Sequence, residues 1–351
     1  ARLAESGEFT QRAFLHGRID LTQAEAVLDL VHANSELGSA LAVQQLKGKL
    51  YNEIEKVKKQ VLATASLVEA SIEFPEEDIE FAHRDECVRQ IKQACADLER
   101  LLVHSNQGLM FREGFSVALI GRPNVGKSSL LNRLLRDQRA IVTTLPGTTR
   151  DYIEESIKIK GVTFRLIDTA GIRNTKDLIE AEGIRQTRNV LNRSDLVLLI
   201  MDGGEKLSDE DLGLIRDIEN NKTISVINKI DLLSGSEPGW IKEISWLESV
   251  LVSAKTGEGC DELESSLFNK ATLDGIPHKD EIWITNRRQQ QAAERALASL
   301  LQARQGLEQL KGEEFVAVDL RSCLNALGDV VGQTTPDDLL GHIFSEFCIG
   351  K

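Results

Sequence analysis

One segment combines two glycines, a lysine and a serine at the spacing of a phosphate-binding loop: Gly121-Arg-Pro-Asn-Val-Gly-Lys-Ser128. The backbone N–H groups of such a loop point at anionic oxygens, and glycine allows the backbone angles and the close approach that this requires. Lys127 would then reach the β- and γ-phosphates of a nucleotide, and the Ser128 hydroxyl would bind Mg²⁺. By composition alone, about one chain in a hundred of this length would show the pattern by chance. The prediction of a triphosphate site therefore needs support from other residues.

A carboxylate follows a later apolar run, in the segment Asp168, Thr169, Ala170 and Gly171. The run Phe164 to Ile167 is predicted to be a strand, so Asp168 would emerge at the carboxyl end of a sheet, where open α/β sheets bind ligands. Its side chain would help to complete a metal shell, and Gly171 would offer a backbone N–H. Alone, these four residues are more typical of an ordinary exit from a strand. After a phosphate-binding loop they support the same site.

Two further segments indicate which base the site would hold. Asn228, Lys229 and Asp231 follow the apolar strand Ile224 to Ile227. A carboxylate at Asp231 accepts hydrogen bonds from the ring N–H and the exocyclic amine of guanine, whereas adenine has no such pair of donors. After the next predicted strand, a backbone N–H for the base carbonyl would come from Ser253, Ala254 and Lys255. The sequence therefore favours GTP over ATP.

The segment between the phosphate-binding loop and Asp168 is rich in hydroxyl groups: Ala140-Ile-Val-Thr-Thr-Leu-Pro-Gly-Thr-Thr-Arg-Asp151. These hydroxyls and the glycine suit a mobile segment that becomes ordered over the γ-phosphate and Mg²⁺, with a threonine as second hydroxyl ligand. The alternative is a plain surface loop. The neighbouring motifs favour the first interpretation.

The composition is that of a helix-rich soluble protein, with 41% hydrophobic and 28% charged residues and six prolines among 351 residues. The net charge of −13 disfavours a broad nucleic-acid surface but leaves room for a local basic patch. Five cysteines without metal-ligand spacing indicate a reducing, cytoplasmic compartment. No apolar run approaches the ~20 residues that a membrane helix needs. The sequence opens at Ala1 without a methionine or a signal peptide, so we expect further residues upstream.

Two kinds of pattern divide the chain into three parts. Residues 1–112 carry apolar residues at steps of three and four, which predicts long amphipathic helices with a break at Ile72 to Asp78. Residues 113–274 alternate short apolar runs with amphipathic segments, which is typical of an α/β domain with a mostly parallel sheet. Residues 275–351 return to helical patterns. The sequence thus predicts an α/β P-loop GTPase domain inserted into an all-α helical domain, with strands at 115–120, 152–159, 162–167, 196–201, 223–228 and 250–253.

The order of these motifs resembles that of translation-factor-class GTPases. Three flanking segments narrow the resemblance to the MnmE (TrmE) family of tRNA modification GTPases: Gly7-Glu-Phe-Thr-Gln-Arg-Ala-Phe14, Phe74-Pro-Glu-Glu-Asp78 and Cys348-Ile-Gly-Lys351. The resemblance spans the whole given sequence. It also implies a further N-terminal domain that binds a folate one-carbon donor, and this domain is absent from the sequence.

The resemblance implies a set of nucleotide and cation ligands. GTP would contact Asn124, Val125, Gly126, Lys127, Ser128 and Ser129 of the loop, with Thr143 and Thr149 from the segment that follows. Mg²⁺ would be held by Ser128 and Thr149. Potassium would be held by Asn124, Thr143, Leu145 and Thr148, in the place where other GTPases use an arginine finger. The alternative for Asn124 is that its side chain only shapes the loop.

Three further roles follow from the resemblance. Ras-like proteins orient the attacking water with a glutamine where this chain has Ile172, so the catalytic group is sought downstream and matches Glu180. Cys348 would be a nucleophile or a redox partner, or else a buried apolar residue. Arg18 and Lys351 match positions that contact 5-formyl- or methylene-tetrahydrofolate in the family. From the residues alone, Glu180, Arg18 and Lys351 would be solvated surface charges.

The function that the resemblance implies is a potassium-stimulated GTPase in a tRNA-modifying complex. It would act as a homodimer with the flavoprotein MnmG (GidA), which binds FAD, to add an aminomethyl or carboxymethylaminomethyl group at C5 of the wobble uridine. An alternative is a GTP-switched ribosome-assembly factor like Era or Der, but those carry a basic, β-containing RNA-binding module after the GTPase domain, where this chain has helical patterns. An ATPase regulator is a weaker third interpretation.

Overall fold

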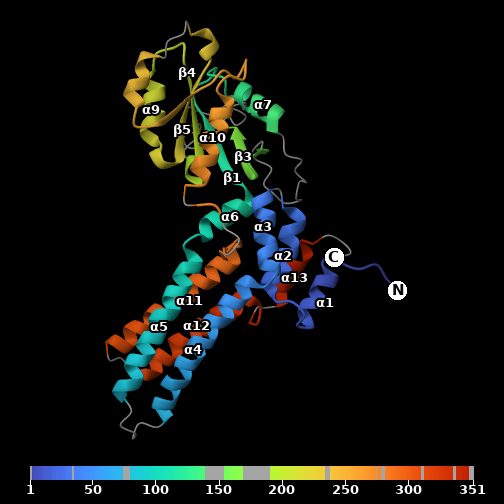
Figure 1. Cartoon of the computed structure of the whole chain (residues 1–351), viewed down its shortest axis with the longest axis vertical. Coiled ribbons are helices and arrows are strands. Elements are labelled where there is room, and N and C mark those ends of the chain that lie inside the picture. Colours follow the sequence, from blue (N-terminus) through green and yellow to red (C-terminus); the bar gives the residue numbers. More distant parts are fainter. Residues whose placement is uncertain are drawn as a thin grey trace, which may run out of the picture. The chain divides into compact units, whose positions relative to one another are not determined.

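The computed structural model describes residues 2–33, 35–73, 80–138, 154–168, 190–233, 238–273, 275–277, 281–309, 312–334 and 337–347 (Figure 1). The chain divides into two compact units. One comprises Glu113–Ile276 with Asn34–Glu36, and the other comprises Ala1–Ala33, Leu37–Arg112 and Pro277–Lys351. We call them the G unit and the helical unit. Because the G unit interrupts the helical unit in sequence, the predicted insertion of an α/β domain into an all-α domain is confirmed.

The G unit is built on a six-stranded sheet with the order β2-β3-β1-β4-β5-β6. Its strands are β1 (Phe115–Ile120), β2 (Glu154–Ile159), β3 (Val162–Asp168), β4 (Leu196–Asp202), β5 (Thr223–Asn228) and β6 (Glu248–Leu251). All pairings are parallel except the β2–β3 hairpin. The last strand was predicted two residues too late, at 250–253. It ends at Leu251 because the Ser253 amide donates to the Glu258 carbonyl, which turns the chain into a loop.

The strands at the centre of the sheet are apolar on both faces because helices cover the sheet. Every residue of β1, β4 and β5 is buried, which explains why these strands read as continuous apolar runs. Helix α7 (Lys127–Gln138) contacts β2 and β3, and α10 (Cys260–Ala271) contacts β5. Ile215 of α9 (Asp209–Asp217) joins a core cluster with residues of β1 and β4. Short 3₁₀ turns lie at Asn220–Lys222, Ile230–Leu232 and Gly239–Ile244.

Four long helices form the main core of the helical unit. They are α4 (Lys49–Glu73), α5 (Glu80–Leu102), α11 (Arg287–Glu308) and α12 (Glu313–Val331), and Figure 1 shows them side by side. The apolar residues that recur every three or four positions in the sequence line this core. The remaining helices are α1 (Glu8–Leu15), α2 (Leu21–His32), α3 (Glu36–Leu46), α6 (Ser105–Glu113) and α13 (Asp337–Ser345). None of the helices in the described ranges is long and apolar enough to cross a membrane.

A second, smaller core joins the beginning of the chain to its last described helix. Leu21, Ala24 and Leu28 of α2 are buried together with Ile343 and Phe344 of α13. The start of α2 is fixed by a capping box, in which the Asp20 side chain accepts from the Gln23 amide while Gln23 reaches back to the Asp20 amide. Both ends of the helical unit are thereby packed against each other.

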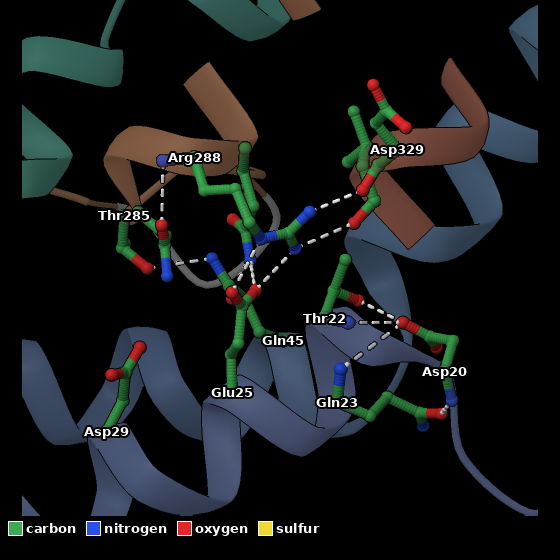
Figure 2. Close-up of polar contacts among 12 residues, drawn as sticks. Asp20, Thr22, Gln23, Glu25, Asp29, Gln45, Thr285, Arg288 and Asp329 are labelled. Carbon is green, nitrogen blue, oxygen red and sulfur yellow. Dashed lines mark hydrogen bonds and ion pairs between the residues drawn. The ribbon is translucent and has the colours of Figure 1, made fainter. Parts of the chain in front are cut away.

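A buried polar network joins the two halves of the helical unit, as Figure 2 shows. Arg288 at the start of α11 donates two 2.8 Å hydrogen bonds to the Glu25 carboxylate of α2, and the Gln289 side chain donates a third. Arg288 also donates to the backbone carbonyls of Asp329 and Val330 at the end of α12. Glu25 is 3% exposed, so removal of Arg288 would leave a buried carboxylate without its counter-charge. The periodicity of the sequence predicts helices in each half but does not show that the two halves contact each other.

The segment that leads back from the G unit is held against α6. Trp283 is buried, and its ring stacks on His104 at 4.8 Å between centroids and tilts against Phe111 at 5.7 Å. Arg112, the last residue before the G unit, pairs with the buried Asp29 at 2.7 Å. Both connections to the inserted unit therefore start from anchored residues.

Candidate nucleotide-binding site

The loop between β1 and α7 folds back onto the ends of β4 and β5. Gly121 and Gly126 have positive φ angles of 149° and 101°. A Cβ atom at Gly121 would overlap the Ile200 carbonyl oxygen of β4, and one at Gly126 would overlap the side-chain nitrogen of Asn228. Glycine is therefore required at both positions by the close approach as well as by the backbone angle. This geometry lies at the carboxyl end of β1, where the strand order of the sheet reverses.

The Lys127 side chain makes hydrogen bonds to the backbone of this loop. Its ammonium group donates to the carbonyl oxygens of Gly121, at 2.8 Å, and Arg122, at 2.7 Å, and the residue is 7% exposed. Lys127 is also the first residue of α7, and the N–H groups and dipole at a helix N-terminus favour an anion. The loop therefore gathers a fixed positive charge and a helix N-terminus at one point.

Asn228 connects the loop to the base-recognition segment. Its side-chain N–H donates to the Val125 carbonyl at 2.9 Å, while its side-chain oxygen accepts from the Ala254 amide at 3.0 Å. The residue is 1% exposed at the end of β5. One buried amide thus holds the phosphate side and the base side of the site at a fixed spacing.

The other predicted base-binding residues lie next to this bridge. Ser253 donates to the Asp231 carboxylate at 2.7 Å, and Asp231 itself is exposed. Lys229, which has a φ of 68°, pairs with Asp202 at the end of β4 at 2.6 Å. Asp202 is the direct partner of Asn228 in the β4–β5 register, so the sheet itself places these groups together.

A pocket of about 590 Å³ opens beside these residues. It brings together seven residues that the sequence predicted as GTP ligands: Gly126, Ser129, Asn228, Lys229, Asp231, Ala254 and Lys255. It also contains Asn132, Arg133, Arg136 and Leu232, which belong to none of the predicted nucleotide-binding motifs. Ser129, Asn132, Arg133 and Arg136 are spaced three and four residues apart, so one face of α7 supplies them. That spacing was visible in the sequence, but only the fold shows that this face borders the pocket.

The structure describes only some of the other predicted site residues. Asp168 ends β3 opposite Leu119 of β1, at the same edge of the sheet as the loop, but its side chain is not described. Asn124 and Ser128 are exposed on the loop and on the first turn of α7, and Arg18 is exposed in the helical unit. The following lie outside the described residues: Thr143, Leu145, Thr148, Thr149, Thr169, Ala170, Gly171, Glu180, Cys348 and Lys351.

Comparison with known proteins identifies the family. Residues 21–348 match the family profile of the MnmE helical domain. The chain is 43% identical over 352 residues to the tRNA modification GTPase MnmE of Alkaliphilus oremlandii, covering 100% of this chain and 76% of that protein. It is 42% identical over 353 residues to the protein of the same name from Desulforamulus reducens, with 100% and 77% covered.

Among solved structures, similarity is found to the G domain of the FeoB iron transporter of T. maritima. The identity is 28%, the TM-score is 0.34, and the match covers 45% of this chain and 99% of that one. Era of Aquifex aeolicus is 26% identical with a TM-score of 0.36, over 53% of this chain and 67% of that one. The profile match over most of the chain and the full-length identity to its relatives show that this chain belongs to the MnmE family of tRNA modification GTPases.

Proposed function

We propose that GTP hydrolysis by this tRNA modification GTPase is stimulated by K⁺ and drives a conformational step in the modification of a wobble uridine. The observation that carries the proposal is the Asn228 bridge, which fixes the loop around Lys127 against the Asp231 and Ala254 side of one pocket. A guanine nucleotide fits this arrangement because its base presents two donors to a carboxylate and its phosphates meet the start of α7.

The loop offers oxygen ligands for the two cations. Ser128 and Asn124 are both exposed at the N-terminal side of α7, and hydroxyl and amide oxygens are ligands that hard cations prefer. Ser128 with Thr149 would hold Mg²⁺, while Asn124 with Thr143, Leu145 and Thr148 would hold K⁺. When bound, these cations supply positive charge where negative charge builds up during phosphoryl transfer.

Other residues of the chain would bind the phosphates, orient the base and position the attacking water. Lys127 would bind the β- and γ-phosphates, and Asp231 and the Ala254 amide would orient the base. Glu180 would hold the attacking water through a second water. We further propose that the protein acts as a homodimer with a flavoprotein that carries FAD, and that Arg18, Lys351 and Cys348 serve the folate-dependent chemistry on uridine.

The cation dependence of hydrolysis tests the mechanism. We expect GTP turnover to be at least tenfold faster in KCl than in NaCl at equal ionic strength. The Asn124→Ala variant should lose this difference, because its amide oxygen is the proposed ligand on the loop, and Asn220→Ala, an exposed asparagine outside the pocket, should keep it. Equal rates in both salts would remove K⁺ from the mechanism and leave Asn124 with a structural role.

The role in tRNA is tested by nucleoside analysis. Wobble uridines of tRNA from a strain that lacks this protein should be unmodified, and the wild-type gene should restore the modification where the Glu180→Ala gene does not. Unaltered uridines in the deletion strain would refute the proposal in favour of a ribosome-assembly role.

A further inference from the structure

The second residue of the phosphate-binding loop carries a side chain that the nucleotide chemistry above does not use. Arg122 pairs with the Asp211 carboxylate, with 2.8 Å between Nε and Oδ2, and with Glu205, with 2.9 Å between Nη2 and Oε2. Its own side chain is 20% exposed, whereas that of Asp211 is 2% exposed. A loop residue is thus bound to a carboxylate buried in another part of the G unit.

Asp211 is fixed independently of Arg122. It lies in the first turn of α9, where Oδ2 accepts from the backbone amide of Ser208, at 3.0 Å, and from its hydroxyl, at 2.8 Å. Ser208 in turn accepts from the Asp211 amide, so the two residues form a capping box. The second oxygen, Oδ1, is buried without a hydrogen-bond partner among the described residues. A buried carboxylate in this state depends strongly on a positive partner.

The second partner of Arg122 leads to a different element. The Glu205 backbone carbonyl accepts from the indole N–H of Trp240 at 2.8 Å, and Trp240 packs against the core cluster of β1 and β4. Burial lowers the pKa of the Arg122 guanidinium, but its hydrogen bond to Glu205 and its ion pair with Asp211 raise it overall. The guanidinium is therefore held as a cation between the buried Asp211 carboxylate and the exposed carboxylate of Glu205, whose backbone is fixed by Trp240.

The backbone of Arg122 contacts Lys127, the predicted phosphate ligand. Its carbonyl oxygen accepts from the Lys127 ammonium at 2.7 Å, the shorter of the two hydrogen bonds of that group to the loop. The same residue thus contacts Lys127 through its carbonyl and α9 through its guanidinium. Movement of the Arg122 side chain would shift the carbonyl that orients the lysine.

We propose that Arg122 is a positioning residue for GTP hydrolysis, which holds the Lys127 ammonium in place by tying the loop to Asp211 and Glu205. This inference rests on the GTPase activity. A slightly misplaced lysine interacts less well with the charge that builds up in the transition state. Nucleotide binding depends also on the base contacts of Asp231, which are unchanged, so it is weakened less. The loss of Arg122 therefore lowers kcat more than it raises KM.

The test compares Arg122→Ala, Arg122→Lys and Asp211→Asn with Arg216→Ala, which removes an exposed arginine of α9. We measure kcat and KM for GTP, the affinity for a fluorescent GDP analogue, and the melting temperature, all on the full chain. Arg122→Ala should lower kcat at least tenfold while KM and GDP affinity change less than threefold. Arg122→Lys should recover part of the rate, because a lysine retains a positive charge, and Arg216→Ala should behave as wild type.

A double-variant cycle separates positioning from a general loss of stability. If Arg122 acts through Asp211, the double variant Arg122→Ala with Asp211→Asn should be no slower than the slower single variant. Multiplication of the two kcat losses would overturn the proposal. So would an unchanged kcat in Arg122→Ala, or a kcat loss that appears only near a lowered melting temperature. A wild-type chain without GTP turnover would instead refute the proposed function, so the two failures are distinguishable.

Discussion

At the residue scale, the site depends on side chains that hold backbone groups. The side-chain amide of Asn228 donates one hydrogen bond to the backbone of another segment and accepts one from the backbone of a second. The Lys127 ammonium donates to two carbonyls of its own loop. Groups that are already fixed in this way lose little freedom when a nucleotide binds, which favours both affinity and correct alignment. The specificity of the site should then rest on the few groups that face the base.

Asp231 is the residue whose chemistry should decide which base binds. In the Asp231→Asn variant, an amide nitrogen replaces an acceptor, so one guanine donor loses its partner and the affinity for GTP should fall about tenfold to a hundredfold. Xanthine carries a carbonyl in place of the exocyclic amine and should bind the variant better than the wild type. Competition between GTP and XTP for binding measures this change in base preference. Glu243→Gln, which neutralises an exposed carboxylate of the same unit, is the control and should leave the preference for guanine intact.

At the element scale, the helices of the helical unit shield their cysteine thiols. Burial raises the pKa of Cys87 in α5 to about 11 and that of Cys323 in α12 to about 12. Both values lie above the ordinary thiol value of 9.0, so the folded protein keeps these protons where the unfolded chain loses them. Their contribution to stability is therefore complete below pH 9 and decreases as the pH rises through 11 and 12.

This shielding predicts slow modification of both thiols. The thiolate is the reactive form, so alkylation of Cys87 and Cys323 at pH 8 should be at least a hundredfold slower in the folded protein than in denaturant. Mass spectrometry of tryptic peptides, sampled over time, measures each site separately. Rapid alkylation of either thiol under native conditions would show that α5 or α12 opens far more often than its packing indicates.

At the scale of the whole molecule, one buried ion pair connects parts of the chain that are 263 positions apart. Glu25→Gln leaves the Arg288 guanidinium without its counter-charge, and breaking a buried pair in this way costs about 3–5 kcal/mol. Glu69→Gln, which breaks the exposed Glu69–Arg321 pair between α4 and α12, should cost at most about 1 kcal/mol.

Hydrogen exchange of the full chain measures both variants. In Glu25→Gln, amides of α11 and α12 should exchange faster, while those of β4 in the G unit should keep their protection, because β4 belongs to the other compact unit. Equal effects of the two substitutions would contradict the assignment of Glu25 to the joint between the halves. Loss of protection in β4 would show that the two units unfold together.

The sequence by itself determined the features that depend on local pattern. Strand, glycine loop and helix at Phe115 to Gln138, the carboxylate after β5 and the apolar periodicity of α4 all follow from neighbouring residues, so the fold class, the insertion and the preference for guanine could be predicted. The end of β6 was misplaced because a hydrogen bond within the following loop, between the Ser253 amide and the Glu258 carbonyl, decides where that strand stops.

Only the tertiary structure decided which distant side chains meet. Three such contacts cannot be read from the sequence. They are the pair Arg122 and Asp211, the pair Glu25 and Arg288, and the position of Arg133 and Arg136 of α7 beside the pocket. Each contact depends on how whole elements pack, and a charged residue on a helix has the same local pattern whether its partner is water or a buried carboxylate. The sequence therefore fixes which chemistry the chain can perform, and the packing of its elements fixes which residues hold that chemistry in position.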